Sequence, residues 1–125
     1  MKKTIIIGED EQLLLDMYKL KFSNEGFKVI TKTEAKSCLD WLDSHHADLA
    51  LIDIMLPKMN GLSLIKNLRE KPRHNKMKII ILTNLSESDV NLHATVRESL
   101  SVDGYFIKSK ISPNQLVNKV KALLQ

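Results

Sequence analysis

Short runs of isoleucine, leucine and valine recur along this chain, separated by segments in which apolar residues follow a helical spacing. Short β-branched runs bounded by turn residues are typical of buried strands, and strands that alternate with amphipathic helices form parallel sheets. We expect strands over 4–8, 27–31, 48–54, 77–82 and 102–107, and five helices over 11–24, 33–44, 62–71, 86–100 and from 113 onward. The sequence therefore predicts one α/β domain over residues 1–125, with a five-stranded parallel sheet between two layers of helices.

The predicted helix ends carry start and stop signals. Gly26 follows the first helix as a stop, and Thr33 is placed to cap the second. Ser112 and Gln115 have the spacing of a capping box, with Pro113 at the first helical position. These signals support the helix boundaries given above.

Charged and hydroxyl side chains follow four of the five predicted strands. Glu9 and Asp10 come after the first strand, and Asp53 lies near the end of the third. Thr83 follows the fourth strand and Lys108 follows the fifth. Because the carboxyl ends of parallel strands meet at one edge of a sheet, we expect these side chains to form one pocket. Carboxylates are ligands for Mg²⁺, while a hydroxyl and an ammonium suit phosphoryl oxygens, so the sequence predicts a magnesium and phosphoryl site.

Taken singly, most of these residues have ordinary explanations. Glu9 and Asp10 precede a helix and would complement its dipole, and Thr83 and Lys108 would be common strand-end residues. Asp53 differs, because an acid inside an apolar strand carries a desolvation cost unless something pairs with it. An ionised carboxylate can also attack phosphorus once positive charge offsets its repulsion with the phosphoryl group. Asp53 is therefore the candidate acceptor, with Lys108 and Mg²⁺ as the source of that charge.

A set of motifs spans nearly the whole chain. Its members are Glu9-Asp10, the run Asp53-Ile54-Met55-Leu56-Pro57 followed by Asn60-Gly61, then Thr83, and finally Lys108 preceded by Tyr105. With these motifs the chain resembles the receiver domain of two-component response regulators. The resemblance implies a flavodoxin-like, doubly wound sheet with strand order 2-1-3-4-5 and five helices. It also implies a cytoplasmic signalling switch of a phosphorelay rather than an enzyme.

The same resemblance implies roles for the acidic residues. Asp53 would accept a phosphoryl group from a sensor histidine kinase or a histidine phosphotransfer protein. Mg²⁺ would be bound by Asp10, Asp53 and the backbone carbonyl of Met55, with Glu9 in support.

The resemblance further implies how the phosphorylated state is read. Thr83 and Lys108 would contact the phosphoryl oxygens. Tyr105 would be the switch aromatic that turns inward when Thr83 moves toward the phosphate, although simple packing at the sheet edge is the alternative for this residue. The switch would remodel the surface of helix 4, strand 5 and helix 5, which is also a candidate homodimer interface.

Three positions depart from the family pattern. Ser109 follows the lysine where the family usually has a proline joined through a cis peptide bond, and a non-proline cis bond costs roughly 3 kcal/mol. Asn84 follows the threonine where a small residue is usual, which would narrow access for the phosphoryl group. The segment 100–104 lacks the family's common glycine-alanine pair, which concerns the output face rather than the chemistry.

Other functions fit the residues less well. A haloacid-dehalogenase-type phosphatase needs a second aspartate two residues after its nucleophile, where this chain has Met55. A dinucleotide-binding domain needs a glycine-rich first turn, and only Gly8 is present there, before two acids that would repel a pyrophosphate. A receiver-like module that docks a partner without being phosphorylated remains the open alternative. The cognate kinase, and whether an effector domain is attached, are also left open.

Composition and charge limit the partners. The net charge is +4, and the densest basic stretch, residues 66–78, is either a docking patch for an acidic partner or a solvated helix end and loop. No aromatic residue interleaves with these basic residues to stack on bases, so we expect no nucleic-acid binding by this domain. No apolar run reaches membrane-spanning length, and we expect no membrane contact.

The cysteine and the histidines give weaker indications. The single cysteine, Cys38, has leucine neighbours and is expected to be a buried thiol, in keeping with a reducing, cytoplasmic setting. His45 and His46 are adjacent, so their side chains diverge, and His74 and His93 stand alone. We expect the histidines to be surface or loop residues rather than metal ligands.

Overall fold

One parallel sheet forms the centre of the molecule. The computed structural model describes residues 2–59, 61–84, 98 and 101–125. Over these residues all paired strands are parallel and follow the order β2-β1-β3-β4-β5. The strands are β1 (Thr4–Gly8), β2 (Lys28–Lys32), β3 (Leu49–Asp53), β4 (Lys78–Thr83) and β5 (Gly104–Ile107). The expected α/β class and the strand order 2-1-3-4-5 are confirmed.

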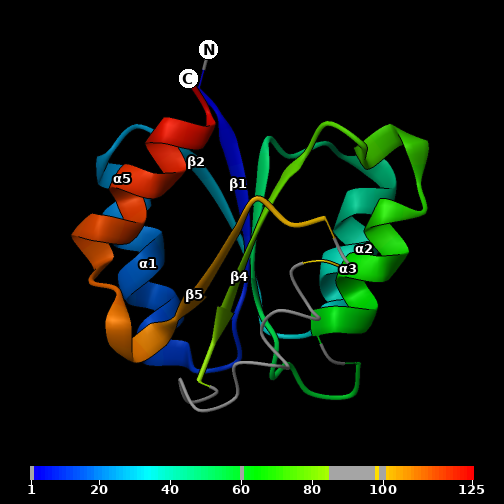
Figure 1. Cartoon of the computed structure of the whole chain (residues 1–125), viewed down its shortest axis with the longest axis horizontal. Helices are drawn as coiled ribbons and strands as arrows, with labels where there is room; N and C mark the ends of the chain where they lie inside the picture. Colours follow the sequence, from blue (N-terminus) through cyan, green and yellow to red (C-terminus); the bar gives the residue numbers. More distant parts are fainter. Residues whose placement is uncertain (1, 60, 85–97, 99–100) are drawn as a thin grey trace.

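Helices cover both faces of this sheet. They are α1 (Gln12–Asn24), α2 (Ala35–Ser44), α3 (Gly61–Arg69) and α5 (Pro113–Leu123), with short 3-10 helices η1 (Pro72–His74) and η2 (Lys108–Lys110). Figure 1 shows α1 and α5 on one face of the sheet and α2 and α3 on the other. The expected helix over 86–100 falls outside the described residues, apart from the single position Glu98. None of the helices in the described part of the chain has the length and hydropathy of a membrane span.

The two helix layers enclose two separate apolar cores. One core joins α1 and α5 to the sheet and includes Leu15, Phe22 and Val117; the other joins α2 and α3 and includes Leu42 and Leu64. Strand β3 belongs to both cores, since all of its residues are buried. Its nearly continuous apolar sequence is the pattern expected of a strand covered on both faces.

Most of the helix-end signals act as the sequence predicts. Ser112 and Gln115 form the capping box at the start of α5, with hydrogen bonds of 3.1 and 2.8 Å between each side chain and the other's backbone. Gly26 ends α1 with φ of +92°, a conformation that glycine adopts without steric cost. The capping role expected of Thr33 is wrong, because the N-cap of α2 is Glu34 and no side chain caps it. Glu34 has an extended backbone, and its side chain pairs with Lys58, 3.1 Å away.

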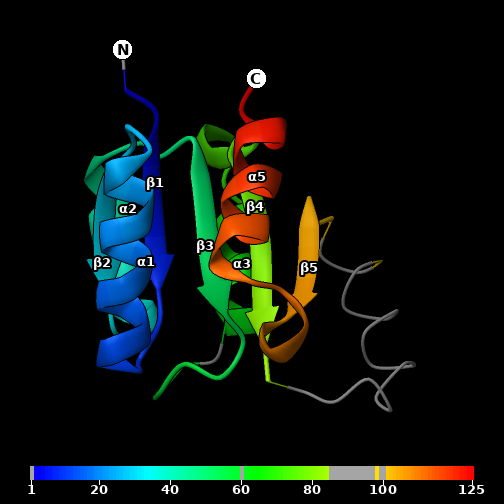
Figure 2. The same ribbon diagram turned by 90° about the vertical axis from the view of Figure 1, so that its left-hand side faces the viewer.

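The topology determines where a site can lie. Because the strands are parallel, their carboxyl ends meet at one edge of the sheet. Figure 2 shows both chain termini at the other edge, where the strands begin. The carboxyl ends of β1, β3, β4 and β5 therefore lie far from either terminus.

Candidate functional site

The strand register aligns the ends of four strands. Gly8 at the end of β1 is paired with Ile52, and Asp53 at the end of β3 is paired with Leu82. Thr83 at the end of β4 is paired with Ile107, the residue before Lys108. The register thus brings the ends of β1, β3, β4 and β5 to the same level of the sheet.

Lys108 ties two of these strand ends together. Its Nζ lies 2.8 Å from Asp53 Oδ2 and 2.5 Å from Glu9 Oε1. The side chains of Asp53 and Glu9 are only 3% and 2% exposed, and that of Lys108 is 10% exposed. A buried charge is costly unless it is paired, so one ammonium here stabilises two carboxylates that would otherwise repel each other. These three charged groups form an ion cluster at the buried side of the site.

The loop after β3 fixes the direction of the Asp53 carboxylate. The backbone N–H of Met55 donates to Asp53 Oδ1 at 2.9 Å, so each carboxylate oxygen accepts one hydrogen bond. The loop closes where the N–H of Gly61 donates to the carbonyl of Ile54 at 2.8 Å. A Cβ atom at Gly61 would overlap the carbonyl oxygen of Asp53 and lie 2.9 Å from Ile54 Cα. Only glycine lets α3 begin this close to the end of β3.

Burial and pairing shift two pKa values at the site. Burial raises the pKa of Glu9 and the charge of Asp53 adds to this, which outweighs the hydrogen bonds from Lys108 and from the Glu11 backbone. Burial alone would lower the pKa of Lys108, but its hydrogen bonds and charge interactions with Asp53 and Glu9 raise it overall. Lys108 therefore stays positively charged at neutral pH.

The acidic side chains form a cluster suited to a divalent cation. Glu9, Asp10 and Asp53 each present one oxygen, and these oxygens lie within 4.8 Å of one another. Glu9 and Asp53 are buried, whereas Asp10 is exposed and opens the cluster to solvent. Hard carboxylate oxygens with access to water are what Mg²⁺ prefers, so this donor set fits the expected ion.

The remaining candidates lie around this cluster. Thr83 is fully buried at the end of β4, and Tyr105 on β5 is 5% exposed, within the core on the side of α2 and α3. Asn84 is exposed, next to Thr83. Ser109 lies in η2, and the peptide bonds of the described residues are all trans, including the one that follows Lys108.

Tyr18 lies within electrostatic reach of the site, which sequence reasoning did not predict. It lies on α1 and is 5% exposed. Burial raises its pKa; the charge of Lys108 lowers it, and the charges of Glu9 and Asp53 raise it. The helical spacing of α1 predicts that Tyr18 is buried, but no sequence pattern shows how near it lies to the acids.

Much of the basic stretch over residues 66–78 has partners inside the molecule. Arg69 donates to the carbonyls of Met77 and Ser101 at 3.0 Å each. Lys71 lies 3.2 Å from Asp43 Oδ1, and Arg73 donates to the Asp43 carbonyl at 2.6 Å. These contacts join α3 and η1 to α2 and to the segment before β5. Three of the six lysine and arginine residues in this stretch, Arg69, Lys71 and Arg73, therefore hold helices in place.

Two of the expectations for single residues are now tested. Cys38 is fully buried, as expected, and burial raises the pKa of its thiol to about 12. The histidines were expected to be surface or loop residues, and His74 lies in the connection between α3 and β4 but is only 2% exposed. His45 and His46 are exposed, and His93 lies outside the described residues.

Comparisons with known proteins agree with this arrangement. A family model described as "Response regulator receiver domain" matches residues 5–121. The regulatory protein VanR of Enterococcus faecium is 32% identical over 125 residues, which is all of this chain and 51% of VanR. The chain likewise spans about half the length of the other curated relatives that it matches, among them the response regulator GtcR of Aneurinibacillus migulanus.

Solved structures share the fold. A CheY-like response regulator receiver domain protein from Methanospirillum hungatei superposes with a TM-score of 0.87 at 27% identity, covering 99% of this chain and 94% of that one. The BeF3-activated receiver domain of DrrB superposes with a TM-score of 0.83 at 23% identity, covering 99% of this chain and 98% of that one. The family match over nearly the whole sequence, together with the five-stranded sheet and its acidic strand ends, shows that this chain belongs to the response regulator receiver domain family.

Proposed function

We propose that this receiver domain is a phosphorylation-dependent switch of a two-component system and that Asp53 is its phosphoacceptor. The observation that carries the proposal is the buried Asp53 carboxylate, held between the Met55 amide and the Lys108 ammonium at the open edge of the sheet. A sensor histidine kinase or a histidine phosphotransfer protein would supply the phosphoryl group. Such a switch would act in the cytoplasm.

The proposed reaction needs few protein groups. A carboxylate oxygen of Asp53 attacks phosphorus while the bond from phosphorus to the donor imidazole nitrogen breaks, and the imidazole leaves with that electron pair. Lys108 already contacts Asp53 Oδ2 at 2.8 Å, so it can follow the new phosphoryl oxygens with a small movement. Thr83 would donate its hydroxyl to another of these oxygens from the neighbouring strand end. Positioning and charge stabilisation of this kind account for most of the catalysis of phosphoryl transfer.

Mg²⁺ would be held by Asp10, Asp53 and the backbone carbonyl of Met55, with Glu9 in support. When bound, the ion supplies positive charge that offsets the repulsion between the carboxylates and the phosphoryl group. Glu9 keeps Lys108 in place through the contact between Oε1 and Nζ. Its second oxygen accepts the N–H of Glu11 at 3.2 Å, which orients it from the start of the loop into α1.

Transmission of the phosphorylated state from Asp53 to the protein surface would depend on Thr83 and Tyr105. These residues lie on adjacent strands, and Tyr105 is paired with Ile81, two residues before Thr83. A shift of Thr83 toward a phosphoryl group would change the space beside Tyr105 and so change the surface around β5 and α5. We propose this surface, together with the segment 86–100 for which the sequence predicts the fourth helix, as the output face and as the interface of a homodimer.

The experiment is covalent labelling of the intact protein. Incubation with Mg²⁺ and acetyl phosphate should add one phosphoryl group, seen by mass spectrometry as an acid-stable, base-labile adduct. The Asp53→Ala variant should lose the adduct, whereas Asp16→Asn, which removes an exposed acid of α1, should keep it. Beryllofluoride with Mg²⁺ should shift the amide resonances near residue 53 in the wild type and in Asp16→Asn but not in Asp53→Ala. A wild type that forms neither adduct would favour the docking module that acts without phosphorylation.

A further inference from the structure

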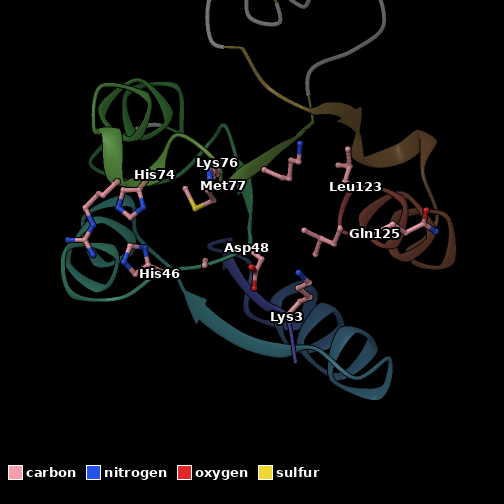
Figure 3. Close-up of a pocket in the computed structure, with 12 residues that line it drawn as sticks. Lys3, His46, Asp48, His74, Lys76, Met77, Leu123 and Gln125 are labelled. Carbon is pink, nitrogen blue, oxygen red and sulfur yellow. The ribbon is translucent and has the colours of Figure 1, made fainter. Parts of the chain in front are cut away.

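A second cavity lies at the opposite edge of the sheet from the acidic site. Its volume is about 380 Å³, within the range of small-molecule sites. It is lined by residues that come before β1, β3 and β4 and by the end of α5, including Lys3, Asp48, Met77 and Leu123. Figure 3 shows His46 and His74 side by side at one end, with Lys3 on the other side of Asp48.

His74 is an unusual residue for a cavity wall. It is 2% exposed, and its Nε2 atom is buried without a hydrogen-bond partner among the described residues. The Leu42 backbone lies close enough to favour the protonated ring, and Nε2 has no hydrogen-bond partner among the described residues. His74 lines the cavity, so this unpartnered ring lies at the cavity wall. A buried polar atom without a partner is costly, and a ligand that supplies the partner recovers that cost.

The surroundings of His74 favour an anion as that ligand. Five cationic or imidazole side chains besides His74 line the cavity: Lys3, His46, Arg73, Lys76 and Lys78. Asp48 is the one acidic side chain in the described lining, and its Oδ2 already accepts the Thr4 N–H at 2.8 Å. Lys3 and Lys76 make no ion pair with any described residue, so their charge is free to act on a ligand.

Electrostatic neighbours explain why His74 is neutral without a ligand. Burial lowers its pKa, and the positive charges of Arg73, His46 and Lys71 lower it further. The hydrogen bond with the Leu42 backbone raises the pKa but does not offset these effects. An anion beside the ring would reverse the balance, because it favours the imidazolium form, in which Nε2 carries a proton to donate.

We propose that this cavity binds a small organic phosphate, with the phosphate group between His74 Nε2 and the Lys76 ammonium and the organic part over Met77. The ring of His46 packs edge-on against that of His74, with centroids 6.1 Å apart, and covers it. His46 is exposed and can turn aside to admit the ligand. The ligand would bind at the edge opposite Asp53, so the two sites can be tested separately.

The test is an NMR titration of the full chain with sulfate at constant ionic strength. Sulfate keeps its double negative charge between pH 6.5 and 7.5, so a pH effect reports on the protein. We expect saturable shifts confined to residues 46–48 and 74–78. The affinity should rise about tenfold from pH 7.5 to pH 6.5, because above its pKa the protonated fraction of an imidazole changes tenfold per pH unit. Phenyl phosphate should bind more tightly than sulfate, since its ring can contact Met77.

Matched variants separate a site from general attraction by a basic surface. Lys76→Gln should weaken sulfate binding at least about threefold, as expected for one solvated charged contact. Lys66→Gln makes the same charge change on α3 outside the cavity and should leave binding unchanged. His74→Gln should abolish the pH dependence of sulfate binding. If this variant fails to fold, the comparison of Lys76→Gln with Lys66→Gln still tests the proposal. The proposal would be overturned if both lysine variants lost sulfate affinity equally or if phenyl phosphate bound no more tightly than sulfate. It would also be overturned if the NMR shifts did not saturate or appeared only around Lys108.

Discussion

Replacing Lys108 by methionine tests whether its ammonium holds the acidic site together. The substitution keeps the length and the apolar part of the side chain but removes the charge. It leaves Glu9 and Asp53, at 2% and 3% exposure, without their shared partner. Breaking a buried ion pair by removing one member costs about 3–5 kcal/mol. We expect the lower end of this range, because the exposed Asp10 shows that the site is open to water on one side.

The pH dependence of this loss follows from Glu9. Burial already raises the pKa of Glu9, and loss of the Lys108 hydrogen bond raises it further above the value in the unfolded chain. The folded variant then binds more protons than the unfolded one, so it recovers stability as the pH falls. A loss of about 3 kcal/mol at pH 7.5 corresponds to roughly 10 °C in Tm. At pH 5 the difference from wild type should be smaller.

The assay is urea and thermal unfolding followed by circular dichroism, in EDTA, at pH 7.5 and pH 5. Lys119→Met is the matched control, because it removes the charge of an exposed lysine on α5. If Lys108→Met were no less stable than this control, the ion pair would not be holding the carboxylates together. A loss that is the same at both pH values would contradict the role given to Glu9.

Further predictions concern the metal cluster, the loop after β3, the last helix and the thiol. Mg²⁺ at ten times its Kd should stabilise the wild type by about 1.4 kcal/mol in thermal melts, and Asp10→Ala should lose most of this gain; melting curves that ignore Mg²⁺ would refute the metal assignment. Gly61→Ala should destabilise the fold by about 1–3 kcal/mol, the usual cost of overpacking, because its Cβ would overlap the Asp53 carbonyl oxygen. The variant should also label Asp53 more slowly, and normal labelling would show that the loop adapts. Ser112→Ala should cost about 1 kcal/mol in urea unfolding through loss of the capping box, and an unchanged midpoint would contradict that. Cys38, with its pKa raised to about 12, should react with a thiol reagent at pH 8 only as fast as the protein unfolds, and reaction in the dead time would contradict its burial.

The sheet could be predicted from the sequence because its signals are local. The strand Leu49–Asp53 is apolar almost throughout, a pattern typical of a short strand buried on both faces. The parallel arrangement then places every strand end at one edge, which is why the distances among Glu9, Asp53 and Lys108 are short. The position of these residues at one edge of the sheet could therefore be predicted without knowing how their side chains pack.

The features that were missed depend on tertiary contacts. That Lys108 contacts Glu9 as well as Asp53 depends on how far its side chain reaches from the end of β5, past β4, to the ends of β3 and β1. His74 is buried where η1 meets α2, a contact that includes the hydrogen bond from Arg73 to the Asp43 carbonyl. Local propensity contains no information on such contacts.

The placement of both termini at the edge opposite the acidic site has a practical consequence for measurement. A biotin tag, a surface linker or a fluorescent protein attached at either end would sit beside the starts of the strands (Figure 2). An immobilised sample would therefore present Asp10 and the loops around Asp53 to solution, free for a kinase to approach. The same attachment would partly shield the cavity near Lys3 and Leu123, so binding there is better measured with untagged protein in solution.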